Sequence, residues 1–208
     1  MTHEEFYGSF LSDLKQIEQQ LLEMVSLYSE NESQNSELKP IVYCCSRIKS
    51  PDSTMQKIKL QGFAQTAEAA PANFFDSVGV RIICAFVEDV YRVVTWLKEQ
   101  PSIQIIQEKD YYAYPKPNGY RSYHIQLKVL TTEGKELPAE IQVRTIATDF
   151  WATLEHQIKY KKNLTHEKMI RSELKQCADQ IASVDLSMQT IRDIIRESLS
   201  MTGTYPQN

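Results

Sequence analysis

Two runs of alternating apolar residues, separated by a short polar segment, constrain the fold of this sequence more than any other feature. The apolar residues take the odd-numbered positions of both runs: Tyr123, Ile125, Leu127, Val129, Leu137, Ala139, Ile141 and Val143. An apolar residue at every second position is typical of a strand with one buried face. The intervening segment 131–135 contains Gly134 and has the composition of a hairpin loop. We therefore predict two adjacent strands whose odd-numbered side chains face the core.

Polar side chains occupy the even-numbered positions of the same runs and would share the opposite face of the sheet. They are Ser122, His124, Gln126, Lys128, Glu140, Gln142 and Arg144. A carboxylate in the middle of a strand, such as Glu140, is disfavoured, although a solvent-exposed face with Glu–Arg pairs would account for it. The segment 115–119, Pro-Lys-Pro-Asn-Gly, favours a binding site, because it combines stiff prolines with a flexible glycine and leads directly to Tyr120 and Arg121.

Long helices are predicted at both ends of the chain. In residues 6–28 apolar side chains recur at spacings of four and three, and a polar linker follows at 31–36. The same spacing continues through residues 170–199, as in a coiled-coil seam. The seam consists of Ile170, Leu174, Cys177, Ile181, Val184, Met188, Ile191 and Ile195. The pattern allows these helices to pack on each other, on the sheet or across subunits.

Strand and helix patterns alternate between the two terminal helices. Further strands are expected at 41–49, 78–86 and 103–107, and helices at 51–61, 88–99 and 145–160. Ser50 and Gly62 have the residue types of an N-cap and a C-cap, whereas segment 61–73 fits no clear pattern. We predict an α+β fold with a mixed sheet of about five strands flanked by helices. The domain organisation is a helix and linker at 1–36, a central domain at 37–162, and a helix and tail at 163–208.

The helix at 145–160 is expected to separate apolar from functional side chains. Phe150, Leu154 and Ile158 should face inward, with Trp151 beside them. Asp149 and His156 are two turns apart on one face, which can border the polar side of the sheet. A helix with a mixed surface is the alternative interpretation.

Basic and acidic residues gather around the strands expected at 41–49 and 78–86. The side chains of Arg47, Lys49, Ser53 and Lys57 can converge on one anion at a strand-to-helix junction, although a solvated basic helix start would look the same. Arg81 interrupts an apolar strand, so it needs a ligand or an ion pair with Asp76 or another acid. Asp76, at the start of that strand, is well placed to hold a metal ion.

Composition excludes several other classes of protein. The formal net charge of -4 argues against a nucleic-acid coat protein and against binding to anionic membranes. No run is long enough to span a membrane and the N-terminus lacks a signal pattern, so a cytoplasmic location is expected. The four cysteines and four histidines have no CxxC or HExxH spacing, which argues against a disulfide framework or a zinc site.

The string YPKPNGYRSYH at 114–124, followed by EIQVRT and FWATLEH, resembles the synthetase domain of RelA/SpoT-type alarmone synthetases. The resemblance covers roughly residues 47–161 and, at this chain length, is closest to the small single-domain members of the family. It implies a nucleotidyltransferase-like fold and an enzyme, GTP pyrophosphokinase. The implied reaction is Mg²⁺-dependent transfer of pyrophosphate from ATP to the 3′-hydroxyl of GDP or GTP, giving AMP and ppGpp or pppGpp. No His-Asp dipeptide marks the family's hydrolase domain.

The resemblance also implies roles for individual residues. Asp76 would hold Mg²⁺, and Glu140 would serve as the base for the acceptor hydroxyl and help to hold the metal. The ATP side would comprise Arg47, Lys49, Ser53, Lys57 and Arg81. The GDP or GTP side would comprise Lys116, Tyr120, Arg121, His124, Gln142, Arg144, Asp149 and His156. Within it, Tyr120 suits stacking on guanine, and a carboxylate such as Asp149 suits the guanine N–H donors.

Two residues of the sequence, Pro115 and Lys109, depart from the family pattern. Pro115 stands where family members often have His, and Lys109 departs from the acidic form of the preceding signature. The resemblance and the heptads point to a homo-oligomer, with a tetramer favoured, and leave regulation by an alarmone or RNA open. A catalytically silent guanine-nucleotide or RNA-binding regulator on the same fold, and a helical interaction protein, are the competing hypotheses.

Overall fold

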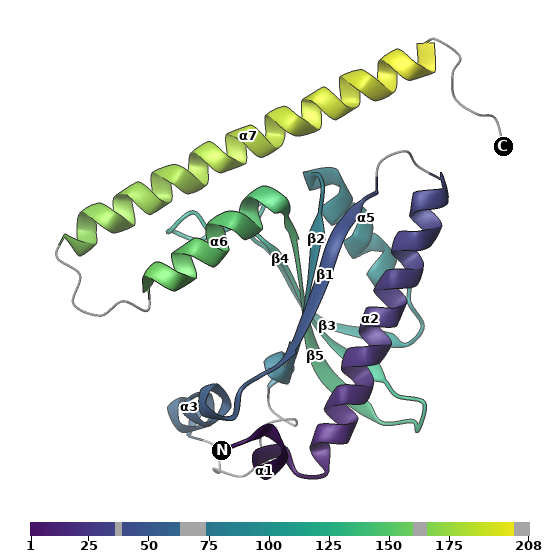
Figure 1. Cartoon of the computed structure of the whole chain (residues 1–208), viewed down its shortest axis with the longest axis vertical. Coiled ribbons are helices and arrows are strands. Elements are labelled where there is room, and N and C mark those ends of the chain that lie inside the picture. Colours follow the sequence, from purple (N-terminus) through teal and green to yellow (C-terminus); the bar gives the residue numbers. More distant parts are fainter. Residues whose placement is uncertain (36–38, 63–73, 160–165, 202–208) are drawn as a thin grey trace.

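The computed structural model of this chain has an α+β fold built on one five-stranded mixed sheet (Figure 1). It describes residues 1–35, 39–62, 74–159 and 166–201. The strands are β1 (Ile41–Ile48), β2 (Val78–Cys84), β3 (Ile103–Asp110), β4 (Tyr123–Leu130) and β5 (Glu136–Thr145), in the order β1-β2-β5-β4-β3. β2 and β5 run parallel, and the other neighbouring pairs are antiparallel. The predicted fold class is confirmed.

The alternation that marks β4 and β5 in the sequence sets their register. Ile125 lies opposite Ile141, and the even-numbered His124 and Gln126 lie opposite Gln142 and Glu140. Every odd-numbered apolar residue of the two runs is at most 9% exposed. Burial of one face therefore fixes the pairing, because a slip of one residue would move this apolar set to the polar side.

Helices cover the apolar face of the sheet. The core joins the odd-numbered residues of β4 and β5 and the even-numbered residues of β2 to α2 (Phe10–Asn35) and α5 (Val87–Lys98). These helices supply buried side chains such as Leu14, Ile17, Val90 and Val93. The short α1 (His3–Tyr7) ends at Gly8, which has φ +52. The predicted linker at 31–36 was wrong over residues 31–35, which continue α2. These residues include neither Gly nor Pro, so nothing in them stops a solvated helix.

The junction between β1 and α3 (Pro51–Gln61) follows the sequence signals closely. The Ser50 side chain accepts a hydrogen bond from Ser53 N, and Gly62 ends the helix in the left-handed conformation with φ +72. After the undescribed residues 63–73, where part of the segment without a clear pattern lies, a single turn of 3-10 helix, η1 (Phe75–Ser77), leads into β2. This turn lies against β5 and β4.

The predicted inward face of α6 (Ile146–Lys159) is wrong. Phe150 is 60% exposed and Leu154 is 41% exposed. Thr148, Asp149, Trp151 and Ala152 are buried instead. The helix turns this way because Asp149 makes ion pairs at the sheet, while Trp151 donates a hydrogen bond to the backbone of the following helix.

The C-terminal helix, α7 (Glu167–Met201), crosses the top of the view in Figure 1 and packs against α6 and α5. Its buried residues, Ala178, Asp185 and Arg192, recur every seven positions. Most of the predicted seam is exposed, including Val184 at 58% and Ile191 at 50%. The face of α7 that packs on the domain is thus not the face that carries its apolar seam, because Asp185 and Arg192 bind polar groups of the domain. Among the described helices, none is long and apolar enough to cross a membrane.

Candidate active site

The polar face of the sheet places predicted donor-side and acceptor-side residues in neighbouring rows. In one row, Gly79 of β2 lies between Arg47 of β1 and Glu140 of β5. Two strand spacings separate Arg47 from Glu140, about 10 Å between their backbones. A Cβ on Gly79 would lie 3.8 Å from Arg47 Cγ. The Arg47 side chain therefore lies over the glycine, and no other residue of β2 separates it from the carboxylate in this row.

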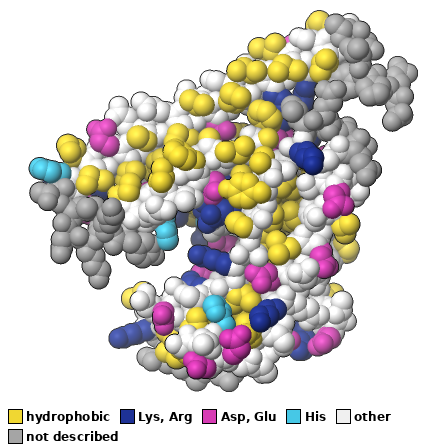
Figure 2. Space-filling model, in the orientation of Figure 1, with side chains coloured by type: hydrophobic (Ala, Val, Ile, Leu, Met, Phe, Trp, Pro, Cys, Tyr) yellow, Lys and Arg dark blue, Asp and Glu magenta, His cyan; other side chains and the backbone are white. Residues whose placement is uncertain are grey.

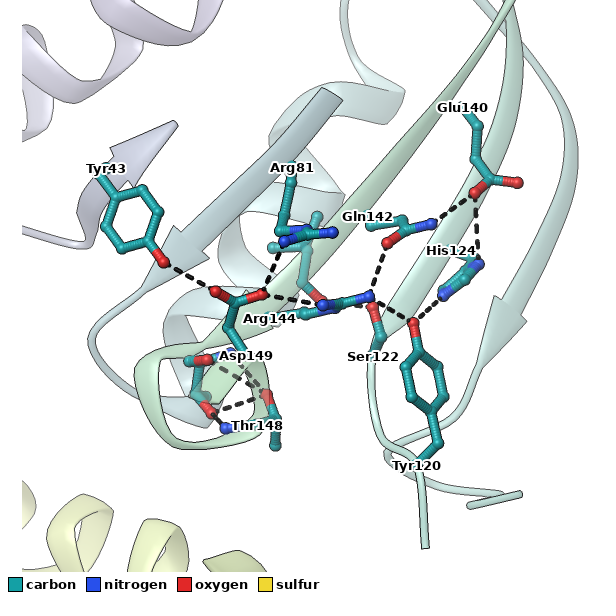
Figure 3. Close-up of polar contacts among 12 residues, drawn as sticks. Tyr43, Arg81, Tyr120, Ser122, His124, Glu140, Gln142, Arg144, Thr148 and Asp149 are labelled. Atoms are coloured by element: carbon teal, nitrogen blue, oxygen red, sulfur yellow. Dashed lines mark hydrogen bonds and ion pairs between the residues drawn. The ribbon is translucent and has the colours of Figure 1, made fainter. Parts of the chain in front are cut away.

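The next rows of the face carry an ion-pair cluster centred on Asp149 (Figure 3). Its Oδ1 atom lies 2.8 Å from Arg144 Nη1 and 3.2 Å from Arg81 Nη1. Its Oδ2 atom accepts a hydrogen bond of 2.8 Å from the Tyr43 hydroxyl. Arg144 is 5% exposed and Asp149 is 7% exposed. Arg81, which was expected to need a ligand or an ion-pair partner, therefore pairs with Asp149 and not with Asp76.

A chain of hydrogen bonds continues from Arg144 to the predicted base. Arg144 Nη2 donates to the Tyr120 hydroxyl at 2.8 Å and to Gln142 Oε1 at 2.8 Å. Gln142 Nε2 donates to Glu140 Oε1 at 2.7 Å. The Tyr120 hydroxyl lies 2.7 Å from His124 Nε2. Figure 3 shows these side chains pointing toward one another from β4, β5 and the loop before β4.

His124 is neutral in this environment. Burial, together with the nearby charges of Arg144, Lys116 and Lys109, lowers the pKa of His124 to about 3. Because arginine can only donate, the Tyr120 oxygen accepts from Arg144 and is free to donate its own proton to His124 Nε2. The imidazole proton then belongs on Nδ1, which lies 3.7 Å from Glu140 Oε1. This contact is a dipole facing a carboxylate, since the neutral ring forms no ion pair.

The loop before β4 presents Tyr120 to the polar face. Gly119 has φ +88, a conformation that favours glycine, and its N–H donates to the Lys116 carbonyl at 2.8 Å. Lys116 Nζ lies over the rings of Tyr111 and Tyr120, 4.6 Å and 4.8 Å from their centroids. These cation–π contacts place a positive charge beside the aromatic ring expected to stack on a base.

A second cluster gathers at Asp76. Lys49 Nζ lies 2.5 Å from Asp76 Oδ2, and Lys57 Nζ lies 2.7 Å from Oδ1. Burial alone would raise the pKa of Asp76, but hydrogen bonds from the two lysines hold it below its usual range. Of the four residues predicted to converge on one anion, Lys49 and Lys57 meet at the carboxylate of Asp76. Ser53 lies in the first turn of α3, one turn before Lys57, and is hydrogen-bonded to Ser50.

Asp76 and Glu140 are the two carboxylates of the site that could take part in holding a magnesium ion. Across the described residues, no group of three His, Cys, Asp or Glu side chains could hold a metal ion. Mg²⁺ in phosphoryl-transfer enzymes typically uses one or two carboxylates together with waters and substrate phosphates. Asp76 on η1 and Glu140 on β5, two elements in contact, provide hard oxygen ligands of the required kind.

The structure separates two predicted site residues from these clusters. The guanidinium of Arg121 contacts α7, where it lies 3.3 Å from the Ala178 carbonyl. His156 is exposed, two turns beyond Asp149 on α6. Ser122, expected on the polar face, is buried before β4 and donates to the Val143 carbonyl.

Two tyrosines of the site were missed from the sequence. Tyr43 shares the strand face of Arg47, so its odd-numbered position in β1 was a usable signal. Tyr111 packs edge-on against Tyr120 and His124. It follows β3 directly, and no local pattern marks it.

Comparisons with known proteins agree on one family. The model for the region found in RelA / SpoT proteins matches residues 46–165. The GTP pyrophosphokinase YwaC of Bacillus subtilis is 42% identical over 156 residues, 74% of this chain and 74% of the relative. A GTP pyrophosphokinase family protein from Streptococcus pneumoniae has a TM-score of 0.82 at 32% identity, covering 97% of this chain and 98% of that one. Small alarmone synthetase 1 of Bacillus subtilis, solved with its product pppGpp, has a TM-score of 0.78 at 28% identity, covering 90% and 96%.

Proposed function

Because this chain belongs to the RelA/SpoT family and is a GTP pyrophosphokinase of the small alarmone synthetase type, we propose that it transfers pyrophosphate from ATP to the 3′-hydroxyl of GDP or GTP. The products would be AMP and ppGpp or pppGpp. The observation that carries this proposal is the row Arg47–Gly79–Glu140, which sets a basic side chain and a carboxylate on one face of the sheet with only a glycine between them. A triphosphate and an acceptor hydroxyl could meet there.

In the proposed reaction Glu140 is the general base. Its carboxylate would take the proton of the 3′-hydroxyl, and the resulting oxygen would attack the β-phosphorus of ATP. The new bond joins the 3′-oxygen to that phosphorus, and the bond from the β-phosphorus to the oxygen shared with the α-phosphate breaks to release AMP. Gln142 orients the carboxylate through its hydrogen bond of 2.7 Å to Glu140 Oε1.

The donor side would bind the phosphates of ATP by an exchange of partners. Lys49 and Lys57 neutralise Asp76 in the structure, and phosphate oxygens could replace that carboxylate as their partner. Asp76 would then be free to help hold Mg²⁺ with Glu140, and the metal would supply charge neutralisation at the phosphates. Arg47, Ser53 and Arg81 complete the side that we assign to ATP, and a guanidinium can either bind phosphate or stack on adenine.

The acceptor side would use the network around Tyr120. We propose that its ring stacks on guanine, while Lys116, His124, Gln142 and Arg144 position the phosphates and ribose. A stacked base gains about 1–3 kcal/mol from an aromatic partner. His156 is retained as a proposed contact on this side.

Asp149 has a different proposed role from the one that its residue type indicated. Both of its oxygens are already occupied, by Arg144 and Arg81 on Oδ1 and by Tyr43 on Oδ2. We therefore propose that Asp149 holds Arg81 of the donor side and Arg144 of the acceptor side in place, and leaves the guanine edge to other groups.

We further propose that the chain forms a homo-oligomer, with a tetramer favoured. Support comes from large apolar side chains that are 41% to 60% exposed: Phe150 and Leu154 on α6, and Val184, Met188, Ile191 and Ile195 on α7. Figure 2 shows apolar side chains following α7 along this face. Burial of such a surface is a common driving force for association. Light-scattering measurement of the mass in solution tests the assembly.

The test of the reaction is an assay with purified protein, Mg²⁺, labelled ATP, and either GDP or GTP, with the nucleotides separated by anion exchange. We expect AMP together with a more highly phosphorylated guanosine nucleotide, and the two acceptors can be ranked by rate. Absence of turnover, with guanine-nucleotide binding that is lost in Tyr120→Ala, would instead identify a silent regulator. Absence of both turnover and binding would contradict either function.

A further inference from the structure

The C-terminal helix α7 contacts the loop that carries Tyr120, although α7 lies wholly outside the family match at 46–165. This loop, residues 115–121, is the part of the acceptor side that is not built on a strand or helix. Its geometry therefore depends on what it packs against. Three sets of contacts join it, directly or through α6, to the same stretch of α7.

The closest contact is between Gly119 and Ala178. Gly119 is buried, and a Cβ on it would lie 2.5 Å from Ala178 Cβ and 3.5 Å from the Lys175 carbonyl. The loop backbone thus rests directly on the helix, and both positions need small residues. Ala178 is 3% exposed, although its immediate neighbours on α7 are exposed.

Arg121 fastens the loop to the same turn of α7. Its Nη1 atom donates to the Ala178 carbonyl at 3.3 Å and to the Gly119 carbonyl at 3.1 Å. Its Nη2 atom lies 3.5 Å from Asp179 Oδ1. One guanidinium therefore joins the loop backbone, the helix backbone and a helix side chain. The side chain is 18% exposed, so these contacts are partly shielded from water.

The ring of Tyr120 packs against the same support. Trp151, Ala152 and Ala178 form a small buried cluster, with Tyr120, Leu174 and Ile181 packed on it. Trp151 Nε1 donates to the Leu174 carbonyl at 2.8 Å, which holds α6 and α7 together beneath the ring. Displacement of α7 at Ala178 would move both the loop backbone and one wall of the Tyr120 site.

We propose that α7 is a working part of the acceptor site, and that Arg121, Gly119 and Ala178 form a clamp that positions Tyr120 for guanine. Arg121 is then a positioning residue and not a ligand of the nucleotide. The inference rests on the proposed binding of a guanine nucleotide beside Tyr120. It requires no contact between α7 and the donor side, where Lys49, Lys57 and Asp76 lie on β1, α3 and η1.

The test compares binding of GDP and of a non-hydrolysable ATP analogue, each measured by calorimetry on the full chain. Ala178→Leu inserts bulk between the helix and Gly119, and Arg121→Gln removes the charged clamp but keeps a polar side chain. We expect both variants to bind GDP at least about tenfold more weakly, because they disturb the stacking ring, and to bind the ATP analogue within about twofold of wild type. Hydrogen exchange in residues 115–121 should be faster in both.

Matched controls lie on α7 itself. Gln180→Leu adds a leucine at an exposed position two residues from Ala178. Arg171→Gln removes an arginine that pairs within the helix, with Glu167. Both controls should bind GDP and exchange the loop amides as wild type does.

The outcomes separate this inference from the proposed function. If wild type binds no guanine nucleotide, the proposed function fails first. If wild type binds GDP and both clamp variants bind it equally well, the clamp is wrong. Equal loss of both nucleotides in Arg121→Gln would also overturn it, because α7 would then support the whole domain and not this loop. A Tyr120→Ala variant gives the GDP affinity expected when the ring is absent, and the clamp variants should approach it.

Discussion

The donor and acceptor sides of this site differ in how much of their arrangement exists before a nucleotide binds. On the acceptor side, Arg144 and Asp149 are buried and hydrogen-bonded to each other, and hydrogen bonds continue from Arg144 to Tyr120 and His124. On the donor side, Arg47 and Ser53 are exposed, and the Lys57 side chain is 32% exposed. The acceptor side is thus held by a connected hydrogen-bond network with a buried ion pair, whereas on the donor side only Lys49 and Lys57 are joined to the partly buried Asp76. Substitutions on the two sides should therefore have different costs in stability and in activity.

The largest expected effect is on turnover and not on folding. Glu140→Ala removes the proposed base and Asp76→Ala removes the proposed metal ligand, so we expect each to abolish detectable synthesis. A loss of about 10²–10⁴-fold is typical when a general base is removed. Both variants should remain folded by circular dichroism, because each side chain is partly exposed.

The control for Glu140 is Glu136→Ala, on the same strand. Glu136 is exposed and pairs with Lys128 at the far end of the hairpin, so its loss should leave the rate unchanged. Retained turnover in purified Glu140→Ala or Asp76→Ala would remove that residue from the proposed chemistry. Loss of the fold in Asp76→Ala would show that the donor side contributes to the stability of the domain as the acceptor side does.

The next effect concerns Asp149, where the two sides meet. Asp149→Asn leaves Arg144 buried without its carboxylate, and breaking a buried pair in this way costs about 3–5 kcal/mol in the free energy of unfolding. Tyr43→Phe is the matched variant, because it removes one hydrogen bond from the same carboxylate and should cost about 1 kcal/mol. Urea denaturation of the two variants measures the difference. Similar stabilities would mean that the buried network is not the support we describe.

The regular parts of the site could be predicted because local signals and burial agreed there. The alternation in β4 and β5 placed His124, Glu140, Gln142 and Arg144 on one face, since a strand has two faces and one was clearly apolar. Ser50 and Gly62 marked the ends of α3 for equally local reasons. The hydrogen-bond and ion-pair partners of these side chains were harder to predict, because they depend on how elements far apart in the sequence meet.

The helix faces show why such partners could not be foreseen. Apolar spacing predicted Phe150 inside α6, but the structure buries Asp149, because its ion pairs with Arg81 and Arg144 fix the rotation of the helix. On α7, no local sequence pattern marks Asp185 as a buried residue. Its carboxylate is nevertheless buried and accepts a hydrogen bond of 2.5 Å from the Thr145 hydroxyl. Hydrophobic periodicity identifies a helix, whereas specific polar contacts decide which side faces the domain.

The smallest expected effect is a pH dependence that distinguishes the two sides. The pKa of His124 is lowered to about 3 from an ordinary value of 6.5, mainly by burial. Between these values the unfolded chain binds a proton that the folded chain does not, so stability falls as the pH is lowered. One such proton changes the free energy of unfolding by about 1.4 kcal/mol per pH unit. Asp76 also has a lowered pKa, but its ordinary value is 3.8, so its contribution is lost only at lower pH.

Of the two sides, the acceptor side should therefore dominate the change in stability between about pH 6.5 and pH 4. Urea denaturation across this range measures the slope, and His124→Gln should reduce it, because glutamine keeps a polar side chain and does not titrate. His166→Asn is the control, since His166 is exposed and its φ of +69 is tolerated by asparagine. Equal slopes in wild type and His124→Gln would show that His124 can be protonated in the folded protein. The assignment of a neutral imidazole beside Glu140 would then be wrong. The conclusion that the acceptor side is fixed before the nucleotide binds would be wrong as well.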